Sequence, residues 1–148
     1  MRKLLSAALV LSLLFALCAC GGEKGTALED HEWKMQLAQS NDLASAQDAD
    51  QRVLAVGEAS DAYPDAAVAE LILTASGGKL SLQDKTNGQE YTGTYSKQKS
   101  SSEGTIYEIV LDGVTGYATV SATEADGAAT PTLPVNLGEV SLYFYPAN

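Results

Sequence analysis

The chain has 148 residues, and its 19 acidic residues outnumber its 9 basic ones, which gives a formal net charge of −10 at pH 7. Proteins that hold nucleic-acid phosphates need a basic surface, so this charge argues against a nucleic-acid partner. One His and two Cys are too few ligands for a zinc or copper site of ordinary composition, and we predict no metal site. The length suits a single domain with a sizeable core.

The beginning of the chain has the features of an export signal. Arg2 and Lys3 precede an uncharged, largely apolar stretch over residues 4–17. As a helix this stretch rises about 20 Å, which is too short for a bilayer core of about 30 Å. It therefore predicts a signal peptide rather than a membrane span.

Leu17-Cys18-Ala19-Cys20 resembles the lipobox of bacterial lipoproteins, in which a Leu and two small residues precede the modified cysteine. Cys18 departs mildly from the usual Ala, Ser or Thr. The resemblance implies that residues 1–19 are a signal peptide and that the sulfur of Cys20 carries a diacylglyceryl lipid. We expect no cofactor besides this lipid. The resemblance also implies that acyl chains anchor the protein at the outer face of the cytoplasmic membrane. The alternative is an ordinary secretory signal with a chance cysteine.

Residues 20–30 are small, polar and Gly-rich, and we expect them to form the lipidated cysteine and its tether. Residues 31–148 are then a single β-domain. Its first strand is predicted over residues 33–37, where apolar and polar residues alternate. Trp33, the only Trp of the chain, is either a core anchor or an aromatic platform for a ligand.

The next segment is less regular. Residues 40–52 are compatible with a weak helical stripe or with a loop, and residues 53–56 are a short strand candidate. A clearer strand follows residue 67, with Leu71 and Leu73 on one face, and it ends at a Ser-Gly-Gly sequence.

Two further strands are predicted over residues 79–83 and 89–96. Asn87-Gly88 lies between them and favours a tight hairpin, because both turn positions accept a positive φ. Gly93, in the middle of the second of these strands, indicates a bend or bulge where the sheet curls.

Four more strands are predicted over residues 105–111, 114–123, 131–137 and 140–145. In the second of them Ala118 and Val120 face inward, and in the last Tyr143 and Tyr145 share the outward face opposite Phe144. Asp112-Gly113 provides a two-residue turn between the first two of these strands. Pro131 and Pro134 indicate that the third is an edge strand, since proline cannot donate to a ladder.

The predicted fold is all-β, an antiparallel meander of about seven to nine strands that closes or curls into a barrel. A β-sandwich is the alternative. The chain from residue 53 on resembles uncharacterised lipoproteins of Gram-positive gut anaerobes at residues 84–88, 91–95 and 106–109. A Trp early in the first strand is also similar to lipocalin-like barrels, although Asp30-His31-Glu32 lacks the Gly which that family has two residues before its Trp. The second resemblance implies a barrel that holds a small ligand.

Catalytic motifs are weak in this sequence, and we expect no enzyme. His31 is the only histidine and lies beside the tether. Residues 76–79 match the S-x-x-K pattern of penicillin-recognising enzymes, but Gly-Gly places them in a hairpin and the companion motifs are missing. Four acidic residues in loops are solvated carboxylates or, alternatively, oxygen ligands for calcium: Asp48, Asp50, Asp61 and Asp65.

Aromatic residues are the candidate ligand-binding residues, namely Trp33, Tyr91, Tyr95, Tyr117, Tyr143 and Tyr145. An exposed strip of tyrosines can stack against sugars or a protein partner, although tyrosine is also enriched in ordinary strands. A filled barrel with an exposed tyrosine patch would favour a non-enzymatic interaction or structural module for an envelope component or protein. A cavity lined by Tyr91 and Tyr95 would favour the alternative, a carrier of sugars, lipids or hydrophobic molecules in the barrel interior or mouth.

Overall fold

The computed structural model describes residues 27–42, 52–125 and 128–147. The strands and the one short 3-10 helix are η1 (Leu28–Asp30), β1 (Trp33–Ser40), β2 (Val53–Val56), β3 (Ala67–Val68), β4 (Leu71–Ser76), β5 (Lys79–Asp84), β6 (Gln89–Ser101), β7 (Gly104–Leu111), β8 (Val114–Ala125), β9 (Ala128–Asn136) and β10 (Val140–Pro146). Among the described residues, no helix has the length and apolar character that a membrane crossing requires.

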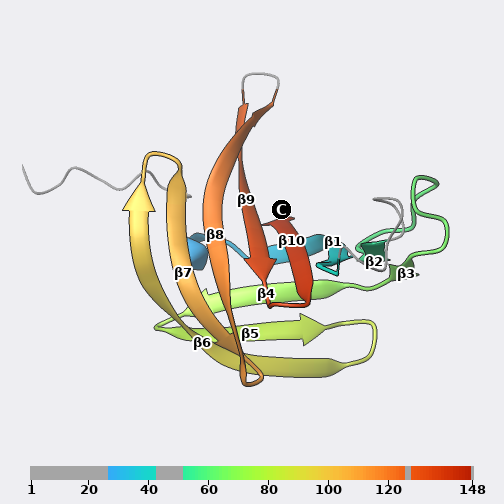
Figure 1. The fold of residues 1–148 in the computed structure, drawn as a ribbon, viewed down its shortest axis with the longest axis horizontal. Helices are drawn as coiled ribbons and strands as arrows, with labels where there is room; N and C mark the ends of the chain where they lie inside the picture. The colour runs from blue at the N-terminus through green and yellow to red at the C-terminus, as the bar shows by residue number, and fades with distance from the viewer. Residues whose placement is uncertain (1–26, 43–51, 126–127, 148) are drawn as a thin grey trace, which may run out of the picture.

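Eight strands form a closed antiparallel barrel in the order β1-β4-β5-β6-β7-β8-β9-β10, and β10 pairs back with β1 (Figure 1). The closing ladder runs from the pair Trp33 and Pro146 to the pair Ser40 and Val140. From β4 onward, each strand of the barrel pairs with the strand that follows it in the chain, as a meander requires. The predicted all-β barrel is therefore confirmed, and the described strands do not form the alternative sandwich.

β2 and β3 lie outside the barrel. β2 pairs with residues 37–39 of β1, whereas β4 pairs with Trp33 and Lys34 on the same side of that strand. β3 runs parallel to β2, which is a departure from a purely antiparallel meander. The side of β1 opposite β10 therefore changes partner between Lys34 and Leu37.

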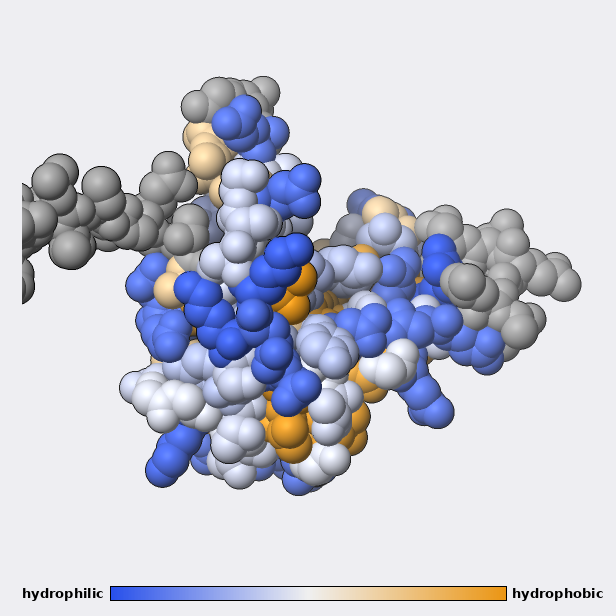
Figure 2. All heavy atoms as spheres, turned by 60° about the vertical axis from the view of Figure 1, so that its left-hand side comes forward, coloured by the Kyte–Doolittle hydropathy of each residue, from blue (hydrophilic) through white to orange (hydrophobic). Residues whose placement is uncertain are grey.

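The barrel interior is filled by side chains that alternate along the strands. The buried core residues are Leu28, Trp33, Met35, Ala38, Leu73, Leu80, Leu82, Tyr107, Ile109, Leu111, Ala118, Val120, Leu133, Val135, Leu142 and Phe144. Ala118 and Val120, which were predicted to face inward, belong to this set. Outward positions are largely polar, and the face of the molecule in Figure 2 is correspondingly mostly hydrophilic.

Two hairpins have the two-residue turns that their sequences favour. Asp112 and Gly113 both take a positive φ, of 49° and 80°, between paired Leu111 and Val114. Gly77 and Gly78 do the same between β4 and β5, with φ of 56° and 79°. Both turns thus use left-handed backbone, which matches the twist of the flanking strands.

The prediction of a tight hairpin at Asn87-Gly88 is wrong. Asp84 pairs with Gln89, so the connection is a four-residue loop, and only Gly88 takes a positive φ. The carboxylate of Asp84 accepts hydrogen bonds from the backbone N–H groups of Thr86 and Asn87, which holds the longer loop in place.

The edge position predicted from the two prolines is wrong for β9 as a whole, because β9 pairs with both β8 and β10. Pro134 pairs with Tyr143 of β10, at a point where the ladder to β8 is interrupted. Pro131 pairs with Ala122 of β8, beyond the last pair that β9 makes with β10. Each proline thus sits where one neighbouring ladder does not need its missing N–H.

β6 is the longest strand and curves strongly around the barrel (Figure 1). A Cβ atom at Gly93 would lie 1.9 Å from the carbonyl oxygen of Val110 on β7. The glycine therefore permits a close approach of the β6 and β7 backbones where β6 pairs with both β5 and β7. The register of the β6–β7 ladder shifts between Lys97 and Lys99.

η1 packs as part of the β-domain, although its residues were predicted to belong to a tether. Leu28 is fully buried in the core. Its backbone carbonyl accepts a hydrogen bond from the indole N–H of Trp33 at 2.9 Å, and its N–H donates to the hydroxyl of Tyr107 at 3.3 Å. Packing against the barrel begins at Leu28 instead of His31.

Candidate functional site

Three of the aromatic candidates face the barrel interior. Trp33 is fully buried, and Tyr91 and Tyr95 are half-buried against the core. The Tyr95 hydroxyl donates a hydrogen bond to Glu29, and its ring contacts Tyr107 edge to face with centroids 5.9 Å apart. Burial, followed by the bond to Glu29, raises the pKa of Tyr95. Trp33 and Tyr95 fix η1 to the barrel, whereas the Tyr91 hydroxyl donates a hydrogen bond to Gln89.

The other three candidates lie on the outer surface, where the structure brings two of them together. Tyr143 and Tyr145 point outward from β10, with Tyr143 36% exposed. Tyr117 is 54% exposed on β8, separated from β10 by β9, and takes no part in the same site.

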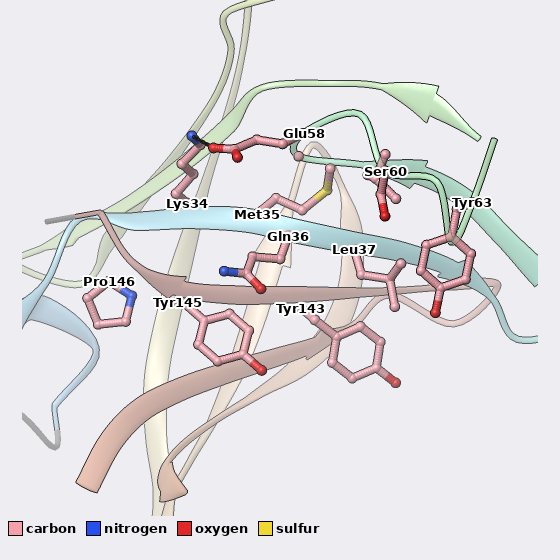
Figure 3. Close-up of a pocket in the computed structure, with 12 residues that line it drawn as sticks. Lys34, Met35, Gln36, Leu37, Glu58, Ser60, Tyr63, Tyr143, Tyr145 and Pro146 are labelled. Atoms are coloured by element: carbon pink, nitrogen blue, oxygen red, sulfur yellow. Dashed lines mark hydrogen bonds and ion pairs between the residues drawn. The ribbon is translucent and has the colours of Figure 1, made fainter. Parts of the chain in front are cut away.

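Tyr143 and Tyr145 line a groove of about 520 Å³ on the outer surface, called the tyrosine groove below. Its lining residues are Lys34, Met35, Gln36, Leu37, Val56, Gly57, Glu58, Ser60, Tyr63, Tyr143, Tyr145 and Pro146. They come from β1, from the end of β2 with the loop after it, and from β10. In Figure 3 the tyrosine rings lie on the same side of β1 as Gln36 and Leu37.

A bulge in β1 contributes to the shape of the groove. Met35 pairs with Phe144 and Leu37 with Tyr143, so Gln36 is an extra residue opposite β10. The bulge turns two successive side chains, Gln36 and Leu37, away from the core, and such irregularities re-aim side chains next to functional sites.

The chain leaving β2 forms the opposite wall of the groove, and Gly57 lets it approach β1 closely. The Gly57 N–H donates to the Gln36 carbonyl at 3.0 Å. A Cβ atom at this position would lie 2.1 Å from the Met35 carbonyl oxygen. A glycine is therefore needed here because of the short distance between the two backbones.

Tyr63 lines the groove but was not among the residues predicted for a binding site. It lies in the loop between β2 and β3, where neighbouring residues have no strand periodicity. Its only sequence signal is the following Pro64, which indicates a turn. Its place across the groove from Tyr143 depends on the pairing of β2 with β1 (Figure 3).

The groove is electrically balanced and rich in hydrogen-bonding groups. Lys34 and Glu58 are its charged lining residues, and they form an ion pair at 3.0 Å. The hydrogen bond to Glu58, followed by the charge of its carboxylate, raises the pKa of Lys34. Ser60 accepts a hydrogen bond from the Ala62 N–H. The lining thus combines aromatic rings, one amide and hydroxyls.

The acidic residues that the structure describes do not form a cluster that would hold a metal ion. No group of three His, Cys, Asp or Glu side chains converges within the described ranges. Asp61 and Asp65 are exposed in the loop between β2 and β3. Asp48 and Asp50 lie outside the described residues, as does Cys20, the expected lipidation site.

The fold and the groove define a class: a closed eight-stranded antiparallel barrel with a packed interior and an aromatic groove on its outer surface. Comparison of the chain with protein-family models, with curated proteins and with solved structures found no match.

Proposed function

We propose that the chain is a non-enzymatic interaction module, anchored at the outer face of the cytoplasmic membrane by a lipid on Cys20. Its partner is an envelope component, which it binds through the tyrosine groove. One observation carries this proposal: the barrel interior is packed with side chains, while Tyr63, Tyr143 and Tyr145 line a groove on the outside. Tyrosine is enriched at binding surfaces because it offers both a large apolar face and a hydroxyl.

The position of η1 supports an arrangement in which the groove is accessible to an envelope partner. Residues 21–26 separate Cys20 from the first described residue and span about 20 Å when extended. η1, the blue coil of Figure 1, lies in the left half of the view, away from β2 and β3 on the right. In the anchored protein the β2 end, with Tyr63, therefore points away from the lipid.

The small-ligand alternative has less support. A carrier that encloses its ligand needs interior volume, and ligand pockets usually bury most of the ligand surface. Inside this barrel Trp33, Phe144, Leu133 and Leu28 are fully buried against their neighbours.

The proposal is tested by sedimentation with isolated bacterial cell envelopes. The protein used is the chain from Gly25 on, which includes every described element. We expect it to sediment with the envelopes, and we expect the double variant Tyr143→Ala/Tyr145→Ala to stay in solution. Tyr117→Ala is the matched control, because it removes a more exposed tyrosine from β8, outside the groove, and it should sediment like the wild type. Equal sedimentation of all three proteins, or of none, would contradict the proposal.

A further inference from the structure

The rings in the tyrosine groove present apolar faces at a strand-determined spacing. Tyr143 and Tyr145 are two residues apart on β10, which separates their Cα atoms by about 6.8 Å and puts both rings on one face. Leu37 and Pro146 extend this apolar surface, and Tyr63 stands at its far end (Figure 3). Such a strip fits a flat ligand whose own faces are lined with C–H groups, because the aromatic face carries partial negative charge.

The same groove offers hydrogen-bonding groups that the described part of the protein leaves unused. Within the described ranges, the hydroxyls of Tyr63, Tyr143 and Tyr145 and the amide of Gln36 have no hydrogen-bond partner. A tyrosine hydroxyl both donates and accepts, and the Gln amide has two donor hydrogens and an acceptor oxygen. A purely apolar ligand would desolvate these groups without replacing their bonds to water, which is unfavourable. A polyhydroxylated ligand satisfies them.

Charge narrows the ligand class further. The ammonium of Lys34 is already paired with Glu58, so the groove offers no unpaired cation to a phosphate or carboxylate. The formal net charge of −10 also opposes an anionic polymer. Glu58 is neutralised by the same contact, so the lining presents no unpaired charge of either sign, and a neutral ligand matches it.

An added peptide strand fits the groove poorly. β1 pairs with β10 over its whole length, from Trp33 to Ser40, and the Gln36 carbonyl accepts the Gly57 N–H. The floor of the groove is thus a sheet face instead of a free strand edge, and strand addition needs such an edge.

We infer that the tyrosine groove binds a neutral sugar ring of an envelope glycan, with the ring stacked on Tyr143 and Tyr145 and its hydroxyls bonded to Gln36 and the tyrosine hydroxyls. This inference rests on the proposed function, since it names the chemical class of the partner. A bound sugar ring would provide a hydrogen-bond partner for each unused polar group of the groove.

The test is a titration of the isotope-labelled chain from Gly25 on with three neutral tetrasaccharides: cellotetraose, chitotetraose and maltotetraose. The readout is the side-chain amide signal of Gln36 in a nitrogen–proton correlation spectrum, which reports contact at the site itself. We expect at least one tetrasaccharide to shift this signal in a saturable way. We expect Tyr143→Ala/Tyr145→Ala to weaken that binding by about tenfold or more, and Tyr117→Ala to leave it within about twofold.

Two results would overturn the glycan assignment. One is the absence of any Gln36 shift at about 10 mM of each tetrasaccharide, a concentration above ordinary weak affinities. The other is a shift that Tyr143→Ala/Tyr145→Ala does not weaken. The sedimentation assay separates this failure from failure of the proposed function. If protease treatment of the envelopes abolishes groove-dependent sedimentation, the partner is a protein; the interaction module then stands and the glycan assignment falls.

Discussion

Asp84 illustrates how a single side chain determines a connection in this barrel. It is 8% exposed at the end of β5. Its carboxylate accepts hydrogen bonds from the N–H of Thr86 at 2.9 Å, the N–H of Asn87 at 3.1 Å and the side-chain amide of Asn87 at 2.7 Å. The bond from the Asn87 side chain is the main reason why the pKa of Asp84 lies below its ordinary value, although burial opposes the shift.

This lowered pKa predicts a pH-dependent contribution to stability. Because the folded chain favours ionised Asp84, the contribution is fully present above the ordinary aspartate pKa of about 3.9 and is lost as the pH falls through the lowered value. The variant Asp84→Asn keeps the shape and removes the charge. Urea unfolding followed by the fluorescence of Trp33 should therefore show a gap between wild type and variant near about pH 6, and this gap should narrow below about pH 4. A gap that stays constant with pH would contradict the role of the charge.

Among the secondary-structure elements, η1 makes several contacts with the barrel core although it has only three residues. It places Leu28 in the core, and hydrogen bonds tie it to Trp33 and Tyr107 on two different strands. The bond from Tyr95 to Glu29 adds a third link, to β6. A segment that reads as polar tether in the sequence thus belongs to the core of the barrel.

Truncating the apolar side chain of η1 should cost more stability than altering its charge. We expect Leu28→Ala to lower the free energy of unfolding by about 3 kcal/mol, because the side chain is fully buried and leaves a cavity. The matched change Glu29→Gln, on the adjacent residue, keeps a hydrogen-bond acceptor for Tyr95 and should cost less than about 1 kcal/mol. Denaturant unfolding of both variants checks this, and equal losses would argue against η1 as a core element.

In the molecule as a whole, closure of β10 on β1 brings the two ends of the domain together. Trp33 near the N-terminal end pairs with Pro146 near the C-terminal end, and the Ala147 N–H donates to the Glu32 carbonyl at 2.8 Å. The same pair of strands forms the floor of the tyrosine groove. Closure of the barrel and construction of the candidate site therefore depend on one ladder.

The proposed anchor predicts a covalent lipid at one position. In a bacterium that processes lipoproteins, cells expressing the full chain and fed an alkyne analogue of palmitate should label the wild type and the matched control Cys18→Ala. They should not label Cys20→Ala. The chemical reason is that the lipid is attached through the sulfur of the modified cysteine, and alanine has no sulfur at that position. Label retained on Cys20→Ala would contradict the assignment.

Much of the fold was predictable because it depends on neighbours in the chain. Alternation with a period of two predicted that Ala118 and Val120 face inward and that Tyr143 and Tyr145 face outward, as the structure confirms. The Asp112-Gly113 turn was predictable because left-handed backbone is a property of those two residues. The Asn87-Gly88 prediction failed because a third residue, Asp84, stabilised a different loop.

The groove was only half predictable, because it joins residues that are distant in the chain. The alternation along the strand places Tyr143 and Tyr145 on one face. No local sequence pattern brings Tyr63 or the Lys34–Glu58 ion pair close to them. That arrangement follows from the bulge at Gln36 and from the contact between Gly57 and β1. Sequence periodicity specifies which face of a strand a residue occupies, whereas long-range pairing specifies which faces meet. For that reason the all-β class and the outward tyrosines follow from the sequence, and the filled interior and the complete groove follow from the closed barrel.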